Sequence, residues 1–351
     1  MPNFTGQLRS NEIFGAIYNM IISQNVFADN IKGTYSSLVD AARVDGTLYG
    51  DTKLYYATDC LTSSVWGNDA EAANLLALHR PEAPEVQSLI IDNFRQIALT
   101  VDDYLSKRAF STEGAFGQFN SVMLGWIRET KKIYDSTLYN VYVGTVEAES
   151  QSIKDVDVTV PAGVSEGQAI AEALANLFTN MQDVSRDYND YKFLRSYSLG
   201  DLKVVWNAKF VNQIKKIDLP TIFHNEGLVD KFAEHVLPER YFGVPKAAGT
   251  SAAGDRSMIE KVYGTGSNAV HCFPGDIIPT GTAVLDGEAY TPSTDIICKV
   301  MHKDSIPFMS AFEVGTSFYN PKSLTENHYL TFGHSTLEYI KNYPIVVIKK
   351  A

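Results

Sequence analysis

The chain has few cysteines and no long apolar run. Its three cysteines, Cys60, Cys272 and Cys298, lie far apart in 351 residues and form no CxxC pair. An odd number of isolated cysteines argues against a disulfide framework or a zinc knuckle and indicates free thiols in a reducing compartment. No run of about 18 apolar residues occurs, so the sequence predicts neither a membrane span nor a secretory signal.

Basic residues are also scarce. The chain holds 30 Lys and Arg against 41 Asp and Glu, which gives a formal net charge of -11. Tight binding of nucleic acid needs a dense cationic surface that neutralises phosphates, and no short window here supplies one. An acidic protein can still enclose DNA, so the composition is compatible only with loose containment.

Catalytic motifs are missing as well. There is no phosphate-binding P-loop, no nucleophile elbow, no HExxH and no EF-hand loop. The residues that could suggest chemistry lack the spacing or the surroundings that a site needs. These are Gly264 and Gly266, His271 and Cys272, His224 and His235, Asp102 and Asp103, and Glu147 and Glu149. The sequence therefore predicts no enzyme, no metal and no cofactor.

Aromatic residues are abundant, with 19 Tyr, 18 Phe and 3 Trp. Some lie in polar segments, such as Tyr188-Asn-Asp-Tyr-Lys-Phe193. Tyrosine is amphipathic and enriched at protein interfaces. A chain of this length also carries many tyrosines for ordinary packing, but the polar setting favours an interface for this segment.

The first hundred residues have too sparse an apolar pattern to fold alone. Residues 1–45 are irregular, with scattered anchors such as Phe4, and suit an arm laid across a neighbour. Residues 47–66 are rich in Tyr, Leu and Thr and predict a strand. A helical stretch at 68–78 follows, and then 86–105 alternates with period two. Two strands around a long connection form an open excursion with too little apolar surface for a domain.

The strongest helix is predicted over residues 113–142. Apolar side chains recur there at spacings of three and four and form one stripe. A helix of roughly 28 residues is about 42 Å long, so it is a structural spine. The stripe comprises Phe116, Phe119, Met123, Trp126, Tyr134 and Leu138.

Strands and short helices alternate in the remainder, which predicts an α+β fold. A capping box at Ser165 and Gln168 opens a helix that continues to about Met181. Residues 243–302 look loop-dominated, with one strand near their end. The other expected elements are strands at 156–160, 201–207, 308–318, 329–332 and 345–348 and a helix at 208–217.

This order of elements, together with several phrases, resembles the Hong Kong 97-type major capsid protein of tailed bacteriophages. The resembling phrases are Phe94–Tyr104, Ile133–Tyr139, Gly200–Phe210 and Phe312–Pro321. The family combines an N-terminal arm, a β extension loop, a long spine helix, a peripheral β-sheet domain and an α/β axial domain. The resemblance implies these divisions: arm 1–45, extension loop 46–108, spine helix and peripheral domain 109–149, axial domain 150–302, and returning peripheral strands 303–351.

The resemblance also implies a function. The chain would be a structural subunit that assembles with itself into pentamers and hexamers of an icosahedral or prolate shell enclosing double-stranded DNA. A scaffolding protein and a portal would assist, with assembly in the host cytoplasm and no membrane involved. The expected inter-subunit contacts are Phe4, Asp51, Lys53, Arg80, Asp92 and Arg95.

Three alternatives remain open at this point. An encapsulin-type nanocompartment has the same fold and encloses a cargo enzyme. A phage tail or sheath protein would form tubes or rings of one symmetry. An enzyme with an unrecognised site would be a compact monomer with a deep polar pocket.

Overall fold

A computed structural model describes most of the chain as two compact units. The residues described are 36–46, 52–63, 78, 80–102, 113–144, 150–215, 235–245, 261–263, 270–272, 290–292 and 295–351. The first unit contains Phe94–Tyr134 and Glu313–Phe332; the second contains Ser37–Asn93, Asp135–Phe312 and Gly333–Ala351. Several long elements continue from one unit into the other, so each unit is considered by itself below.

A five-stranded sheet has the order β1-β12-β13-β3-β2. Its longest strand, β3, alternates between exposed and covered side chains, as a sheet with one solvated face requires. The short strand β1 pairs in parallel with the start of β12, with Arg43 opposite Phe308. These strands are β1 (Arg43–Asp45), β2 (Thr52–Ala57), β3 (Glu85–Asp102), β12 (Phe308–Asn320) and β13 (Thr325–Ser335), and α2 (Ser36–Ala42) precedes β1.

A second five-stranded sheet has the order β4-β14-β11-β5-β6 and lies wholly in the second unit. Its inner strands are apolar runs that are buried on both faces; every residue of β11 is buried. The strands are β4 (Ile153–Val158), β5 (Leu202–Asn207), β6 (His235–Leu237), β11 (Ile296–His302) and β14 (Ile345–Lys350). Strands and helices are thus both present in quantity, which confirms the α+β class.

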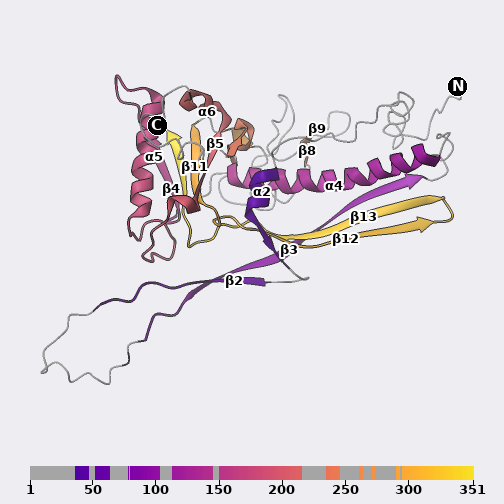
Figure 1. The fold of residues 1–351 in the computed structure, drawn as a ribbon, viewed down its shortest axis with the longest axis horizontal. Coiled ribbons are helices and arrows are strands. Elements are labelled where there is room, and N and C mark those ends of the chain that lie inside the picture. The colour runs from indigo at the N-terminus through magenta and orange to yellow at the C-terminus, as the bar shows by residue number, and fades with distance from the viewer. Residues whose placement is uncertain are drawn as a thin grey trace, which may run out of the picture. The chain divides into compact units, whose positions relative to one another are not determined.

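Helix α5 (Glu166–Gln182) packs on this second sheet (Figure 1). The predicted capping box is present: the Ser165 hydroxyl accepts from the Gln168 backbone N–H, and the Gln168 side chain accepts from the Ser165 N–H. Its buried face joins β5 and α6 (Ala208–Lys215) in one core, within which Ile170 and Met181 are fully enclosed.

The expected spine is observed as α4 (Glu113–Gly144), a single long helix (Figure 1). Gly144 is its last residue, whereas the sequence placed it just beyond the end. A Cβ at Gly144 would lie 1.9 Å from the Tyr241 carbonyl oxygen. The glycine is therefore explained by a close backbone approach as well as by helix termination.

Two expectations about the strands are wrong. The strand expected over 47–66 is confined, among described residues, to Thr52–Ala57, because residues 58–60 are instead held by side-chain hydrogen bonds described below. β14 does not return to the sheet of β12 and β13. It pairs with β4 and β11, where Ile345 to Ile348 are buried.

The stretch 243–302 shows only short strands before β11. β7 (Gly243–Pro245) pairs with β10 (Tyr290–Pro292), and β8 (Lys261–Tyr263) pairs with β9 (Val270–Cys272). The helix expected at 68–78 lies outside the described residues. Among the described helices, none combines the length and apolar character needed to cross a membrane.

Candidate assembly surfaces

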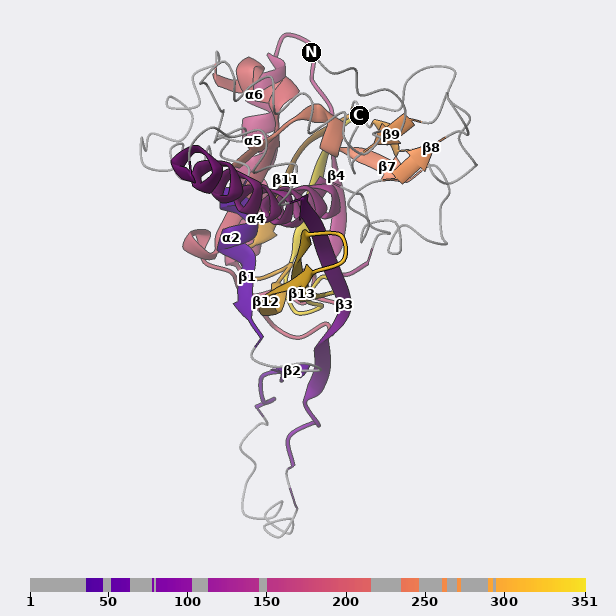
Figure 2. The same cartoon turned by 90° about the vertical axis from the view of Figure 1, so that its right-hand side faces the viewer.

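Strands β2 and β3 form a two-stranded antiparallel ribbon in the second unit (Figure 2). Directly paired residues lie on one face: Thr52 opposite Ile90, Leu54 opposite Ser88 and Tyr56 opposite Val86. All six are exposed. The apolar members are 47–64% exposed, so the face is an uncovered apolar patch. We call Leu54, Tyr56, Val86 and Ile90 the ribbon face.

The opposite side of the ribbon is covered within the subunit. Leu89 and Ile91 form a small core with Met309, and Tyr55 packs against it. Burial raises the pKa of Tyr55, and the nearby Asp304 carboxylate raises it further. The two sides therefore differ: one serves the subunit's own core, and the ribbon face has no covering element among the described residues.

Two of the six expected contact residues lie beside the ribbon with charges that remain available. Lys53 and Arg80 are exposed, and neither has an ion-pair partner among the residues described. Phe4 and Asp51 lie outside the described residues.

The other two, Asp92 and Arg95, have roles within their own units. The Asp92 carboxylate accepts from the Thr336 backbone N–H at 2.8 Å and from its hydroxyl at 2.7 Å. The Arg95 guanidinium lies 6.0 Å from the centroid of the Tyr134 ring. Both are thus already occupied in the single subunit, so they are less suited to contacts between subunits than Lys53 and Arg80.

The β3 leg of the ribbon is fastened to residues 336–342, which we call the bracket. The Gln87 side-chain amide donates to the Tyr339 carbonyl and accepts from the Lys341 N–H, each at 2.9 Å. Asn93 donates to the Thr336 hydroxyl at 2.8 Å. A reciprocal amide pair of this kind fixes both position and orientation.

The other leg is fastened just after β2 by the side chain of Asp59. Its carboxylate accepts from the Leu194 backbone N–H at 2.9 Å and from the Arg186 guanidinium at 2.7 Å. These hydrogen bonds, the Leu194 N–H foremost, lower the pKa of Asp59 to about 2. Arg195 donates to the Thr58 carbonyl oxygen at 2.6 Å. We call these five residues the clasp.

The segment that receives the clasp is built as a closed loop. Ser185 and Arg195 exchange backbone hydrogen bonds at 2.9 and 3.0 Å. The buried Asn189 amide donates to the Phe193 carbonyl and accepts from the Phe193 N–H, each at 2.8 Å. Lys192 has a positive φ of 57° at the turn between them.

This finding corrects the interface expected for Tyr188–Phe193. Phe193 is buried, Tyr191 stacks on it at 5.6 Å between ring centroids, and Tyr188 packs against the core of the second sheet. Asn189, between the aromatic residues, forms the hydrogen bonds that close the loop. The aromatic side chains therefore make packing contacts within the subunit.

The same closed loop is tied to the bracket. The Asp190 N–H donates to the Lys341 carbonyl at 2.8 Å, and the Tyr197 hydroxyl donates to the Asn342 carbonyl at 2.9 Å. The Arg195 Nε donates to the Asn342 side-chain oxygen at 3.2 Å. Both legs of the ribbon are therefore hydrogen-bonded to one connected support, which comprises the closed loop and the bracket.

Four of the six residues of the expected spine stripe have described side chains. Met123, Tyr134 and Leu138 are buried, and Trp126 is half-buried. Tyr134 meets Phe332 edge to face at 5.7 Å between ring centroids. The side chains of Phe116 and Phe119 lie outside the described set.

A partly buried ion pair joins α4 to the end of the expected arm. The Arg43 guanidinium lies 3.3 Å from the Asp135 carboxylate, which is almost fully buried, and 5.8 Å from the Phe308 ring centroid. Leu38, Val39 and Ala42 are also buried. Residues 36–45 are thus anchored within the folded subunit, so an arm that crosses to a neighbour would have to begin before them.

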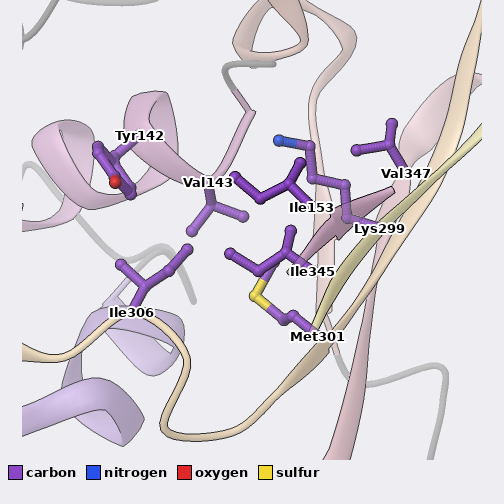
Figure 3. A pocket seen from close by; sticks show the side chains of 8 residues that line it. All are labelled: Tyr142, Val143, Ile153, Lys299, Met301, Ile306, Ile345 and Val347. Carbon is purple, nitrogen blue, oxygen red and sulfur yellow. The ribbon is translucent and has the colours of Figure 1, made fainter. Parts of the chain in front are cut away.

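A small cavity lies between α4 and the second sheet (Figure 3). Its volume of about 10 Å³ suits one water molecule and is far below the roughly 300–1,000 Å³ of ligand sites. Among the described residues, no three His, Cys, Asp or Glu side chains gather as metal ligands. The lining residues are Tyr142, Val143, Ile153, Lys299, Met301, Ile306, Ile345 and Val347.

A second uncovered apolar region lies in the first unit on the β12–β13 hairpin. Phe318 is 66% exposed, and Val314, Tyr319 and Leu324 are 43–46% exposed. Every residue of β12 from Glu313 to Tyr319 is exposed. The strand therefore carries uncovered apolar side chains in this stretch, so the region is a further candidate contact.

The sequence missed the clasp and the bracket. Asp59 is an ordinary charged residue in polar surroundings and lies more than 120 positions before Arg186 and Arg195. No periodicity or motif in the sequence links these residues.

Comparison with known proteins shows to which protein family the chain belongs. The sequence model of the Phi29-like phage major capsid protein family matches residues 5–349. No curated protein matches the sequence significantly. Both of these results concern sequence; the solved structures concern the fold.

Two solved structures share the fold. One, described as the capsid structure of Staphylococcus phage Andhra, is 11% identical, with a TM-score of 0.58 over 93% of this chain and 87% of that chain. The other, described as the head fiber and inner core protein gp22 of native bacteriophage P68, is 10% identical, with a TM-score of 0.56 over 88% and 83%.

The family match spans nearly the whole sequence, including the strands of both five-stranded sheets. It sets aside the encapsulin, tail-protein and enzyme alternatives in favour of a structural subunit of the virion capsid that assembles with its own copies into a shell. The chain belongs to the family of Phi29-like phage major capsid proteins.

Proposed function

We propose that this capsid subunit assembles into pentamers and hexamers of an icosahedral or prolate shell around double-stranded DNA, with each ribbon face covered by a second copy. A scaffolding protein and a portal would assist assembly in the host cytoplasm, and the acidic chain would enclose the DNA loosely. The arrangement proposed is that of the Hong Kong 97-type fold: N-terminal arm, extension loop, spine, peripheral domain and axial domain.

One observation carries the role of the extension loop: the two sides of its ribbon differ in burial. Leu89 and Ile91 are 3% exposed, whereas Leu54 and Ile90 are each 48% exposed. Uncovered apolar patches on proteins that self-assemble mark contact surfaces. Stable interfaces bury about 800 Å² per partner, so the ribbon face would be one part of a larger contact.

The test replaces the ribbon face without unfolding its strands. Threonine is β-branched and keeps strand propensity, so we expect Leu54→Thr/Tyr56→Thr/Ile90→Thr to fold normally. Shell yield, measured by negative-stain microscopy and sedimentation at fixed protein concentration, should fall at least tenfold, because apolar area is lost from every contact.

The matched control is Val160→Thr/Val164→Thr. These side chains are 40% and 36% exposed and lie in the connection between β4 and α5, outside the ribbon and the clasp. The control should assemble as the wild type does. Normal shells from the triple variant would contradict the proposed role of the ribbon face.

A further inference from the structure

We propose that the clasp preorganises the extension loop: Asp59 holds the β2 leg of the loop on its own subunit before assembly, so that the ribbon face meets a second copy in one direction. This proposed effect of the clasp on assembly rests on the proposed function of the ribbon face. The clasp residues themselves lie outside that face and would contact no partner.

Several hydrogen bonds hold Thr58 and Asp59 against residues 186–195. Asp59 alone receives the Leu194 N–H, the Arg186 guanidinium and the Cys60 N–H, all within 2.9 Å of its carboxylate oxygens. The Arg195 bond to the Thr58 carbonyl adds a contact that does not depend on the carboxylate. Such charge-assisted hydrogen bonds are stronger than neutral ones.

The loop 185–195, to which Asp59 is bonded, is itself held by internal hydrogen bonds and can therefore fix the direction of the β2 leg. Its loop is closed by the Ser185–Arg195 bridge and by the two Asn189–Phe193 hydrogen bonds. The bracket that holds it also holds the β3 leg through Gln87. A loop fixed at both legs on one support has a restricted range of directions.

Restricting the loop favours assembly through entropy. A mobile loop loses conformational freedom when a neighbour binds it, and this loss weakens association. A loop that is already held loses less. The clasp should therefore lower the concentration at which shells form, with no new contact to the partner.

The clasp is constitutive. The pKa of Asp59 is lowered to about 2, and the charged group that faces it is Arg186, whose guanidinium stays protonated. Asp59 is therefore ionised at every pH above about 4. The proposal accordingly predicts no dependence of the clasp on pH between 5 and 9.

The experiment uses the full chain with Asp59→Ala, Asp59→Asn and Arg186→Ala. Hydrogen exchange of unassembled subunits should accelerate at least tenfold at the Leu194 amide, whose N–H donates to Asp59, in Asp59→Ala. The acceleration should be smaller in Asp59→Asn, which still accepts hydrogen bonds. Arg186→Ala should have the smaller effect, because the Leu194 contact remains. The concentration for half-maximal assembly should rise about threefold or more in the same order.

Glu172→Gln is the control, because Glu172 is exposed on α5 and away from the clasp. Exchange that is unchanged in all three variants, or faster exchange with unaltered assembly, would overturn the inference. If Asp59→Ala is less stable overall, Arg186→Ala decides, since its side chain is half exposed.

The ribbon-face triple variant is assembled alongside. If it loses shells while the clasp variants do not, the proposed function stands and this inference fails. If the triple variant also assembles normally, the proposed function of the ribbon face itself fails.

Discussion

Asn140 and Asn207 are both fully buried, but only one has its amide paired. The Asn207 side chain donates to the Ile296 carbonyl at 3.0 Å and accepts from the Lys209 N–H at 3.1 Å. Asn140, on α4, has no hydrogen-bond partner for either amide atom among the described residues. A buried amide without partners is destabilising, whereas a paired one is not.

Replacement by leucine should therefore have opposite effects at the two positions. Asn207→Leu leaves the Ile296 carbonyl unsatisfied and should lower the free energy of unfolding by about 1–3 kcal/mol. Asn140→Leu should leave that free energy unchanged or raise it by about 1 kcal/mol. Urea denaturation of unassembled subunits measures both, and a large loss at Asn140 would indicate a partner in the folded subunit.

Lys203 gives the subunit a dependence on pH. Burial lowers its pKa from the ordinary 10.5 to about 8, and the Asp304 carboxylate opposes this shift. Between those values the unfolded chain binds more protons than the folded chain. The contribution of Lys203 to the free energy of unfolding therefore rises as the pH increases from about 8 toward 10.5.

We expect the wild type to gain about 2 kcal/mol relative to Lys203→Met between pH 7.5 and 9.5. The comparison with the variant is essential, because burial raises the pKa of Cys298 and acts in the opposite direction. Denaturant curves at both pH values for both proteins give the difference. A pH dependence that is the same in the two proteins would show that Lys203 keeps an ordinary pKa.

Among elements, α4 is where sequence and structure agree best. An apolar stripe at spacings of three and four can be recognised without knowledge of the rest of the fold, and Met123, Tyr134 and Leu138 of that stripe are buried. The ribbon was predictable only in outline, because strand propensity gives no measure of where a strand stops. Strand β2 ends just before Asp59, whose side chain is hydrogen-bonded to Leu194 and Arg186. These partners lie more than 120 positions later in the chain, so the sequence pattern near Asp59 does not reveal them.

Two leucines on α4 provide a matched test of the spine. Leu138 is 2% exposed and Leu124 is 43% exposed. Leu138→Ala should lower the free energy of unfolding by about 2–5 kcal/mol, and Leu124→Ala by less than about 1 kcal/mol. Equal losses in thermal or urea unfolding would mean that the buried face of the helix is assigned wrongly.

Charge reversals along the extension loop separate assembly from folding. Lys53→Glu and Arg80→Glu should change subunit stability by no more than about 0.5 kcal/mol while reducing shell yield or altering shell size. Arg95→Glu should destabilise the subunit itself, because the guanidinium packs against Tyr134. Reversals at Lys53 and Arg80 that leave yield and size intact would exclude both as assembly contacts.

For the whole molecule, the sequence was sufficient for the α+β class, the order of elements and the family. It was insufficient for the sheet that receives the final strand. The run Ile345 to Ile348 is apolar on both faces, which predicts a central strand but does not say in which sheet. The sheet that β14 joins depends on its pairing with residues of β4 and β11, which lie 44 or more positions earlier in the chain.

The central claim is that this subunit builds a shell in which the ribbon face is covered by another copy. Electron cryomicroscopy of shells assembled from the full chain tests it most directly. The account predicts rings of five and six subunits, with Leu54, Tyr56, Val86 and Ile90 buried against a neighbouring copy and the Asp59–Arg186 pair intact within each subunit. Shells in which those four side chains face solvent would contradict it.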